Sequence, residues 1–145
     1  MIKQGDQAPD FRNLKDLCGK NVVLFFYPKD DTPGCTVEAC GFRDSFKKIE
    51  QLGAVILGVS PDSVKSHDKF IAKFQLPFPL LADEDKKICQ DYGVWVEKSM
   101  YGKKYMGVAR TTVIIDKNGK IAKIFSNVKP EGHNKEVIDV LKSLS

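Results

Sequence analysis

The sequence predicts one α/β domain over residues 1–145, built as a central mixed sheet flanked by helices. Three observations lead to this class. Apolar segments of strand length alternate with amphipathic helical segments, which is typical of parallel strands covered on both faces. A hairpin signal late in the chain adds antiparallel strands. The length of 145 residues fits one domain whose core needs no disulfide or metal to fold.

The first two strands are predicted from short apolar runs. NVVLFFY (21–27) and AVILGVS (54–60) have the length and the β-branched or aromatic content of buried strands. Between them, residues 35–52 follow a helical pattern that Gly53 ends. Four apolar residues repeat at helical spacing after Cys35 and share its face: Ala39, Phe42, Phe46 and Ile49.

A second helix is predicted over residues 60–74. Ser60 suits the N-cap, and Pro61 suits the first helical position. Four apolar residues can supply its buried face: Val64, Phe70, Ile71 and Phe74. His67 in this helix and His133 near the start of the last one are isolated histidines, for which we expect solvent-facing positions rather than metal ligation.

The second half of the chain continues the alternation. The elements predicted there are a short strand over 78–83, a short helix over 84–93, a hairpin of strands over 110–116 and 120–127 joined by KNG, and a helix over 132–144. Residues 94–109 lack clear periodicity, so we expect a loop. The final helix should bury four residues: Val137, Val140, Leu141 and Leu144.

Composition excludes several classes of function. The net charge of +4 comes from 23 basic and 19 acidic residues, and the basic residues are spread along the chain with acidic neighbours, which is typical of a solvated surface and not of a nucleic-acid patch. The N-terminus lacks a secretory signal, and no apolar run approaches the roughly 18 residues of a membrane span. We therefore expect a cytoplasmic protein without nucleic-acid or membrane partners. In that compartment its cysteines should be reduced, catalytic or metal-bound: Cys18, Cys35, Cys40 and Cys89.

Cys35 lies where chemistry is expected. It follows the first strand and opens a helix, and open α/β sheets carry their sites at the carboxyl ends of strands. Unpaired N–H groups at a helix N-terminus favour an anion, and the thiolate is the nucleophilic form of cysteine. Pro28 and Pro33 stiffen the turn, Gly34 permits close backbone approach, and the Thr32 hydroxyl can reach the sulfur or a ligand. The alternative is that Cys35 is a small hydrophobic core residue.

Cys40 cannot pair with Cys35 in an intact helix. Five helical residues rise about 7.5 Å and turn about 500°, which leaves the two Cα atoms roughly 8.6 Å apart. A disulfide needs Cα atoms within about 6.8 Å. If the two cysteines pair, the first turns of the helix must unwind; otherwise Cys40 is an unpaired helix cysteine. The same geometry argues against a shared metal, since zinc sites space cysteines by two to four residues.

Several segments resemble one known family. Pro28, Thr32 and Cys35 match the P-x-x-x-T-x-x-C signature of the peroxiredoxins, and FFYPKDDTPGCTVEACGFRD resembles the Q-type members, also called bacterioferritin comigratory proteins. The similarity extends along nearly the whole chain through GDQAPDF, GVSPDS, PFPLLAD, YGVW, YGKKYMG and EVIDVLK. It implies a thioredoxin-like fold with peroxiredoxin insertions, which agrees with the order of predicted elements. It also implies peroxide reduction without a metal or organic cofactor.

The resemblance also implies residue roles. Cys35 matches the peroxidatic cysteine, which becomes a sulfenic acid, and Cys40 matches the resolving cysteine, which forms an intramolecular disulfide with it. Thr32 matches the residue that hydrogen-bonds the peroxide, and Pro28 the one that shields the sulfur. Arg110 matches the arginine that stabilises the thiolate and polarises the peroxide, although alone it would be taken for a surface residue. Thioredoxin or a similar dithiol would restore the thiols of a monomeric enzyme.

The sequence is also compatible with other interpretations. Cys89 is an alternative resolving residue or core filler, and Cys18 has no assigned role. A salt bridge of Glu38 and Arg43 could hold or release the active helix.

Two other functions are alternatives to a peroxidase. A protein disulfide reductase would normally need two cysteines two residues apart. A redox sensor, in which Cys35 oxidises and passes its disulfide to a partner, differs from a peroxidase in being oxidised stoichiometrically.

Overall fold

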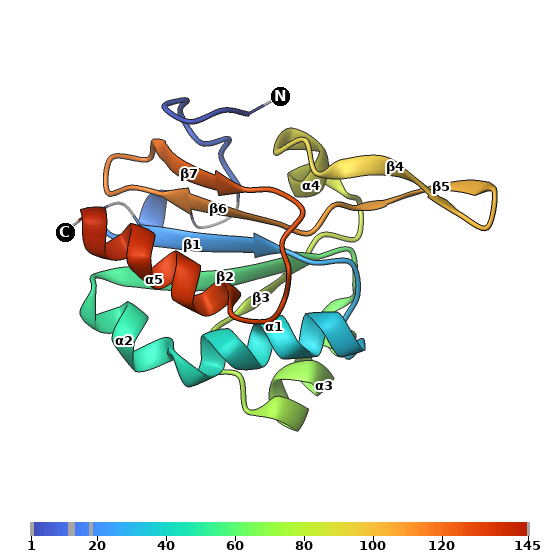
Figure 1. Cartoon of the computed structure of the whole chain (residues 1–145), viewed down its shortest axis with the longest axis horizontal. Helices are drawn as coiled ribbons and strands as arrows, with labels where there is room; N and C mark the ends of the chain where they lie inside the picture. The colour runs from blue at the N-terminus through green and yellow to red at the C-terminus, as the bar shows by residue number, and fades with distance from the viewer. Residues whose placement is uncertain (1, 12–13, 18, 145) are drawn as a thin grey trace.

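A five-stranded sheet forms the centre of the computed structural model, which describes residues 2–11, 14–17 and 19–144 (Figure 1). Its strands lie in the order β3-β2-β1-β6-β7, with bounds β1 Asn21–Phe26, β2 Ala54–Ser60, β3 Leu80–Ala82, β6 Thr111–Ile115 and β7 Ile121–Phe125. β1 pairs in parallel with β2 and antiparallel with β6, and β6 and β7 form an antiparallel hairpin. The predicted mixed sheet is therefore confirmed.

Helices cover both faces of this sheet. They are η1 Lys15–Leu17, α1 Pro33–Asp44, α2 Phe46–Gln51, α3 Val64–Phe74, α4 Lys87–Asp91 and α5 His133–Leu144. Because side chains alternate along β1, Val23 and Phe25 pack with α1, α2, α3 and α5, whereas Val22, Leu24 and Phe26 pack with α4 and the N-terminal segment. No helix in the described part of the chain has the length and apolar character needed to cross a membrane.

The helix predicted over 35–52 is two helices. α1 begins two residues earlier, at Pro33, and ends at Asp44, and α2 begins at Phe46. Ser45 between them leaves helical geometry, and its hydroxyl accepts a hydrogen bond of 2.7 Å from Asn134 of α5. A tertiary contact therefore lies at the break, which local periodicity could not reveal. The predicted buried face is confirmed, with Phe46 half-buried and the other residues buried.

Two other helix details were predicted wrongly. α3 begins at Val64, later than predicted, because Ser60 still belongs to β2 and pairs with β3. Ser63 caps this helix, and its hydroxyl accepts a hydrogen bond from the Ser66 N–H. Val64 is consequently 60% exposed instead of buried. Leu144, the last residue of α5, is 36% exposed, whereas Val137 and Leu141 are buried as predicted.

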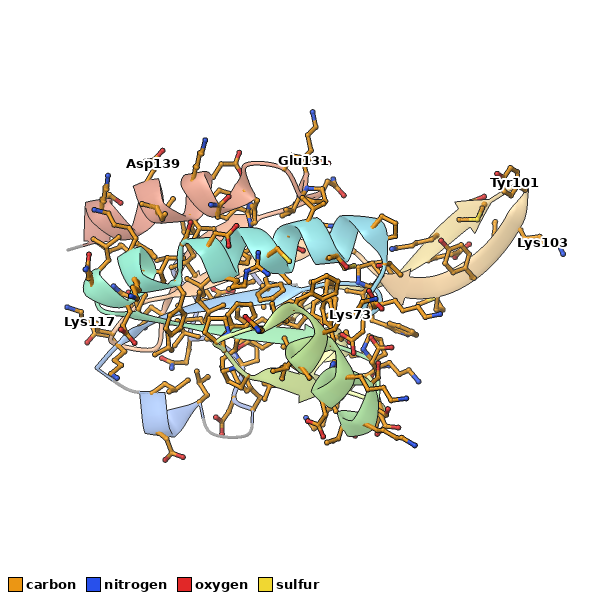
Figure 2. The ribbon with its side chains drawn as sticks, turned by 90° about the horizontal axis from the view of Figure 1, so that it is seen from below. Lys73, Tyr101, Lys103, Lys117, Glu131 and Asp139 are labelled. Carbon is orange, nitrogen blue, oxygen red and sulfur yellow. The ribbon has the colours of Figure 1, made fainter. Side chains whose placement is uncertain are left out.

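The predicted loop over 94–109 is instead a β-hairpin. β4 (Trp95–Met100) pairs with β5 (Lys103–Val108) and projects from the body, with Tyr101 and Lys103 at its far end (Figure 2). Tyr101 and Gly102 form the turn with φ of 53° and 79°, as type I′ hairpins require. Most of the hairpin is exposed on both faces, so its sequence does not show the alternation that marks a half-buried strand.

The close contact of β2 with its neighbours yields a stability prediction. A Cβ atom at Gly58 would lie 2.5 Å from Leu80 Cδ2 and 2.8 Å from Phe25 Cζ. Gly58→Ala should therefore lower the free energy of unfolding by about 1–3 kcal/mol, measured by urea denaturation. Gly107→Ala is the control, because its Cβ would meet the flexible Lys98 side chain at 3.3 Å, and we expect a change within about 0.5 kcal/mol. Equal effects of the two substitutions would contradict this packing argument.

Candidate active site

Cys35 occupies the first turn of α1, directly beyond the carboxyl end of β1. Residues 27–32 connect the two elements, Thr32 is the N-cap residue in extended conformation, and Pro33 is the first helical residue. Cys35 is a free cysteine and is 1% exposed. The backbone N–H groups of this first turn lack intrahelical acceptors, so Cys35 lies at the positive end of the helix dipole.

Arg110 brings a positive charge to this sulfur from a distant part of the chain. It immediately precedes β6, which pairs with β1, so its side chain reaches the N-terminus of α1. Arg110 Nη2 donates to Cys35 Sγ at 3.3 Å, and Arg110 Nη1 donates to Glu38 Oε1 at 2.8 Å. A Cβ atom on Gly34 would lie 3.2 Å from Arg110 Nη2, so this glycine permits the close approach that was predicted.

Glu38 is a site residue whose partner was predicted wrongly. It lies one turn after Cys35 and is 2% exposed, and it pairs with Arg110, whereas Arg43 pairs with Asp44 at 3.0 Å. Burial raises the pKa of the Glu38 carboxyl to about 7, and Arg110 offsets only part of that rise. Its Oε2 atom has no hydrogen-bond partner among the described residues. The sequence signal for this role was its three-residue spacing from Cys35, which places both on one helix face.

The connecting loop orients the Thr32 side chain. Thr32 Oγ1 donates to the Lys29 carbonyl at 2.8 Å, so the hydroxyl hydrogen is committed to the backbone. A hydroxyl has one hydrogen and two lone pairs, and the lone pairs therefore remain as acceptors for a ligand. Pro28 is half-buried at the start of the same loop.

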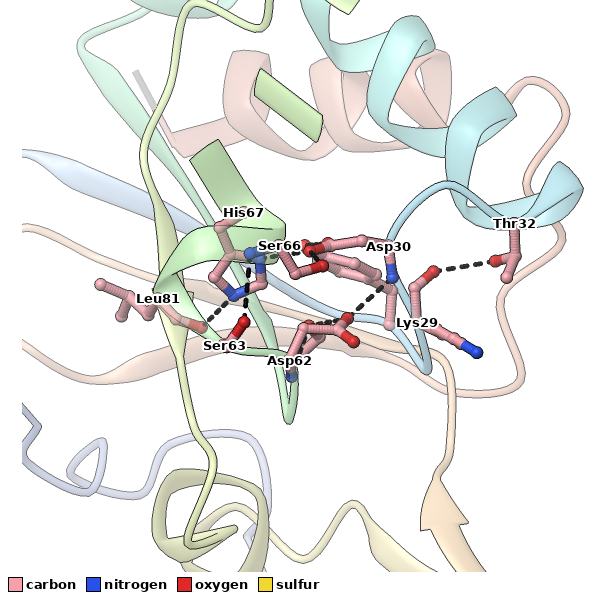
Figure 3. Close-up of polar contacts among 10 residues, drawn as sticks. Lys29, Asp30, Thr32, Asp62, Ser63, Ser66, His67 and Leu81 are labelled. Carbon is pink, nitrogen blue, oxygen red and sulfur yellow. Dashed lines mark hydrogen bonds and ion pairs between the residues drawn. The ribbon is translucent and has the colours of Figure 1, made fainter. Parts of the chain in front are cut away.

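A buried polar network lies under this loop (Figure 3). Asp30 accepts from Tyr27 Oη at 2.6 Å, from Ser66 Oγ at 2.7 Å, and from His67 Nδ1 at 2.7 Å. Asp30, Asp62 and His67 also offer potential metal-ligand atoms within 4.8 Å of one another. Each residue of this trio already has hydrogen-bond partners inside the chain, so the arrangement is that of a hydrogen-bond network.

The surroundings of His67 in this network favour its positively charged form. Its Nε2 lies 3.0 Å from the Leu81 carbonyl, which can only accept, and its Nδ1 faces the Asp30 carboxylate. Burial opposes the charge, but the hydrogen bond and negative charge of Asp30 outweigh it and raise the pKa of His67. The expectation of solvent-facing histidines was wrong for both, since His67 and His133 are buried, and His133 bonds to Thr112 Oγ1 at 2.7 Å.

The remaining cysteines differ in their surroundings. Cys40 is a free, half-buried residue of α1. Because α1 is continuous from Cys35 to Cys40, the Cα separation expected from helix geometry, roughly 8.6 Å, holds for these two cysteines. Cys89 is buried in α4 and packs in the core on the opposite face of the sheet from Cys35. Burial, followed by the nearby Asp83, raises the pKa of the Cys89 thiol. Cys18 lies outside the described residues.

The pKa of Glu38 predicts a pH-dependent stability. Because the folded chain holds this proton up to about pH 7 and an unfolded carboxyl releases it near 4.5, the folded state binds more protons between these values. The free energy of unfolding should therefore fall as pH rises from 5 to 8. Glu38→Gln lacks this titration, so the stability of wild type relative to the variant should decline over that range in urea denaturation. Glu50→Gln, at an exposed position of α2, is the control. A constant difference between wild type and Glu38→Gln would contradict the assignment.

Comparison with known proteins identifies the family of this chain. The AhpC/TSA family model matches residues 4–124. Peroxiredoxin Bcp of Bacillus subtilis is 46% identical, over 99% of this chain and 98% of that protein. A cysteine mutant of Xylella fastidiosa PrxQ superposes with a TM-score of 0.92 at 36% identity, covering 99% of this chain and 97% of that one.

A further solved structure extends this comparison. The bacterioferritin comigratory protein of Xanthomonas campestris, studied for its alkyl peroxide reduction activity, has a TM-score of 0.86 at 42% identity, covering 90% of this chain and 83% of that one. The predicted thioredoxin-like α/β fold is confirmed by these structures. With the family match, the sequence identity and the superposition in agreement, the chain belongs to the AhpC/TSA family and is a peroxiredoxin of the Bcp or Q type.

Proposed function

We propose that this protein is a thiol peroxidase that reduces hydrogen peroxide and organic hydroperoxides, with Cys35 as the peroxidatic cysteine. The observation that carries the proposal is the position of the buried Cys35 sulfur, at a helix N-terminus and 3.3 Å from Arg110 Nη2. Two separate sources of positive potential therefore act on one nucleophilic atom. The reported activity of the Xanthomonas campestris relative on alkyl peroxides gives further support.

In the first step, the Cys35 thiolate attacks the terminal oxygen of the hydroperoxide. An S–O bond forms and the O–O bond breaks, so the sulfur is oxidised by two electrons to a sulfenic acid and the peroxide is reduced. The alkoxide, or hydroxide for hydrogen peroxide, leaves and takes up a proton from solvent. Arg110 stabilises the charge that moves onto oxygen. The Thr32 hydroxyl accepts a hydrogen bond from the peroxide O–H, and Pro28 shields the sulfur.

In the second step, Cys40 resolves the sulfenic acid. The Cys40 thiolate attacks the Cys35 sulfur, an S–S bond forms, and the sulfenic oxygen leaves as hydroxide that becomes water. Because an intact helix separates the two Cα atoms by roughly 8.6 Å, the first turns of α1 must unwind. Glu38 lies between the two cysteines, so the same unwinding separates it from Arg110.

In the third step, an external dithiol such as thioredoxin reduces the disulfide. Its two thiols supply two electrons and two protons, and it leaves as a disulfide. The cycle needs only thiols and peroxide, with no metal or organic cofactor. The proposal places a monomeric enzyme in the cytoplasm, where reducing systems maintain such dithiols.

Removal of the peroxidatic sulfur tests the enzyme assignment. Cys35→Ser should abolish peroxide consumption, measured in a coupled assay with thioredoxin, thioredoxin reductase and NADPH. Cys89→Ala is the matched control, because this cysteine packs on the other face of the sheet, and it should retain turnover. Full steady-state activity of Cys35→Ser would overturn the assignment. Stoichiometric oxidation of wild type without turnover would instead favour a redox sensor.

Removal of the resolving sulfur tests the second step. Cys40→Ser should consume one equivalent of peroxide, accumulate a sulfenic acid that dimedone labels, and lose thioredoxin-dependent turnover, because no disulfide is offered to the reductant. Peptide mapping of peroxide-treated wild type under non-reducing conditions should find a Cys35–Cys40 linkage. Full turnover of Cys40→Ser, or a linkage of Cys35 to Cys89, would move the resolving role away from Cys40.

A further inference from the structure

One peptide group beside the active site is hydrogen-bonded at both ends. This is the peptide that joins Lys29 to Asp30 (Figure 3). Its N–H donates to Asp62 Oδ2 at 2.7 Å, and its carbonyl accepts from Thr32 Oγ1 at 2.8 Å. Because a trans peptide is planar, its N–H and C=O point in opposite directions and rotate together. The direction of the N–H therefore sets the direction of the carbonyl that holds the Thr32 hydroxyl.

Asp62 is itself held in place. Ser60 Oγ donates to the same Asp62 Oδ2 atom at 2.7 Å, and the Asp62 N–H donates back to Ser60 Oγ at 3.3 Å. Ser60 is the last residue of β2 and is fully buried, so these bonds attach the carboxylate to the central sheet. Asp62 thus connects the end of β2 to Asp30, which lies 32 residues earlier in the chain.

The Asp30 side chain anchors the same loop by a separate set of bonds. It accepts hydrogen bonds from Tyr27 of its own segment and from Ser66 and His67 of α3. These bonds fix where the loop lies, but they do not fix the rotation of the preceding peptide plane. That rotation is fixed by the bond from the Asp30 N–H to Asp62.

The consequence falls on the Thr32 hydroxyl. While the Lys29 carbonyl takes its hydrogen, the oxygen presents only lone pairs. A carboxylate that accepts from the other end of the peptide also polarises it, which strengthens the carbonyl as an acceptor. Without Asp62 the peptide can rotate, and the Thr32 hydroxyl is free to turn its hydrogen elsewhere. It would then no longer be fixed as an acceptor for a peroxide O–H.

We propose that Asp62 is a positioning residue for peroxide reduction, acting through the Lys29–Asp30 peptide group on the Thr32 hydroxyl. This inference rests on the proposed function, in which Thr32 accepts a hydrogen bond from the peroxide. Asp62 does not touch the reacting atoms. Its effect should therefore be specific to peroxides, since a reagent that needs no hydrogen bond from its own O–H does not depend on Thr32.

The first experiment compares two reactions of the same sulfur. Asp62→Ala should slow the second-order oxidation of Cys35 by hydrogen peroxide about tenfold, the size expected for loss of one positioned hydrogen bond in the transition state. Alkylation of Cys35 by iodoacetamide should keep its wild-type rate. Asp62→Asn retains an oxygen that can accept from the Asp30 N–H, and it should recover most of the lost rate. Lys73→Ala, which removes the 2.8 Å bond from α3 to Asp31 of the same loop, is the control and should leave both rates unchanged.

The second experiment is a double-mutant cycle with Thr32→Val. If Asp62 acts through the hydroxyl, Asp62→Ala should have no further effect on peroxide oxidation in the Thr32→Val background. A wild-type rate for Asp62→Ala, an equal loss of alkylation, or a tenfold loss that persists in Thr32→Val would each overturn the inference. If Asp62→Ala does not fold, Ser60→Ala takes its place in the double-mutant cycle, because this substitution removes the hydrogen-bond donor that fixes Asp62 Oδ2. Failure of the wild-type protein itself to react with peroxide would instead overturn the proposed function.

Discussion

The Arg110 guanidinium is shared between the Cys35 sulfur and the buried Glu38 carboxylate, and the active site depends on this contact. Its geometry requires the antiparallel pairing of β6 with β1, which brings residue 110 beside the N-terminus of α1. Burial strengthens these electrostatic contacts by excluding water, and it also raises the pKa of Glu38 to about 7. The N-terminal part of α1 is thus held by an ion pair whose carboxyl group is close to neutralisation near pH 7.

The loop between β1 and α1 is attached to the rest of the protein by two independent means. The 2.7 Å contact of His67 with Asp30 fixes the loop to α3, and Asp62 fixes one of its peptide planes to β2. A buried ion pair contributes little net stability when compared with apolar packing, but it strongly favours one geometry over others. The polar residues under the loop are therefore better explained by the precise placement of Thr32 and Cys35 than by stability alone.

Much of the fold could be predicted because its signals are local. The apolar runs of β1 and β2 and the KNG turn depend on neighbouring residues, and the structure has them where they were expected. The break at Ser45 could not be predicted, since it coincides with a hydrogen bond to Asn134 of α5. The β4–β5 hairpin was missed because exposed strands need no hydrophobic alternation. The burial of His67 and His133 depends on partners 37 and 21 residues away in the chain.

The sequence by itself determined the chemical identity of the site: a cysteine at a helix start, a threonine and prolines before it, and a second cysteine too distant to pair within an intact helix. These are relations between residues close in the chain, and helix geometry is sufficient to evaluate them. Only the tertiary structure decided the partners of the charged groups, which assigned Glu38 to Arg110 instead of Arg43 and placed Asp62 behind Thr32. Such pairings join segments that meet only when the sheet forms, so no local pattern encodes them.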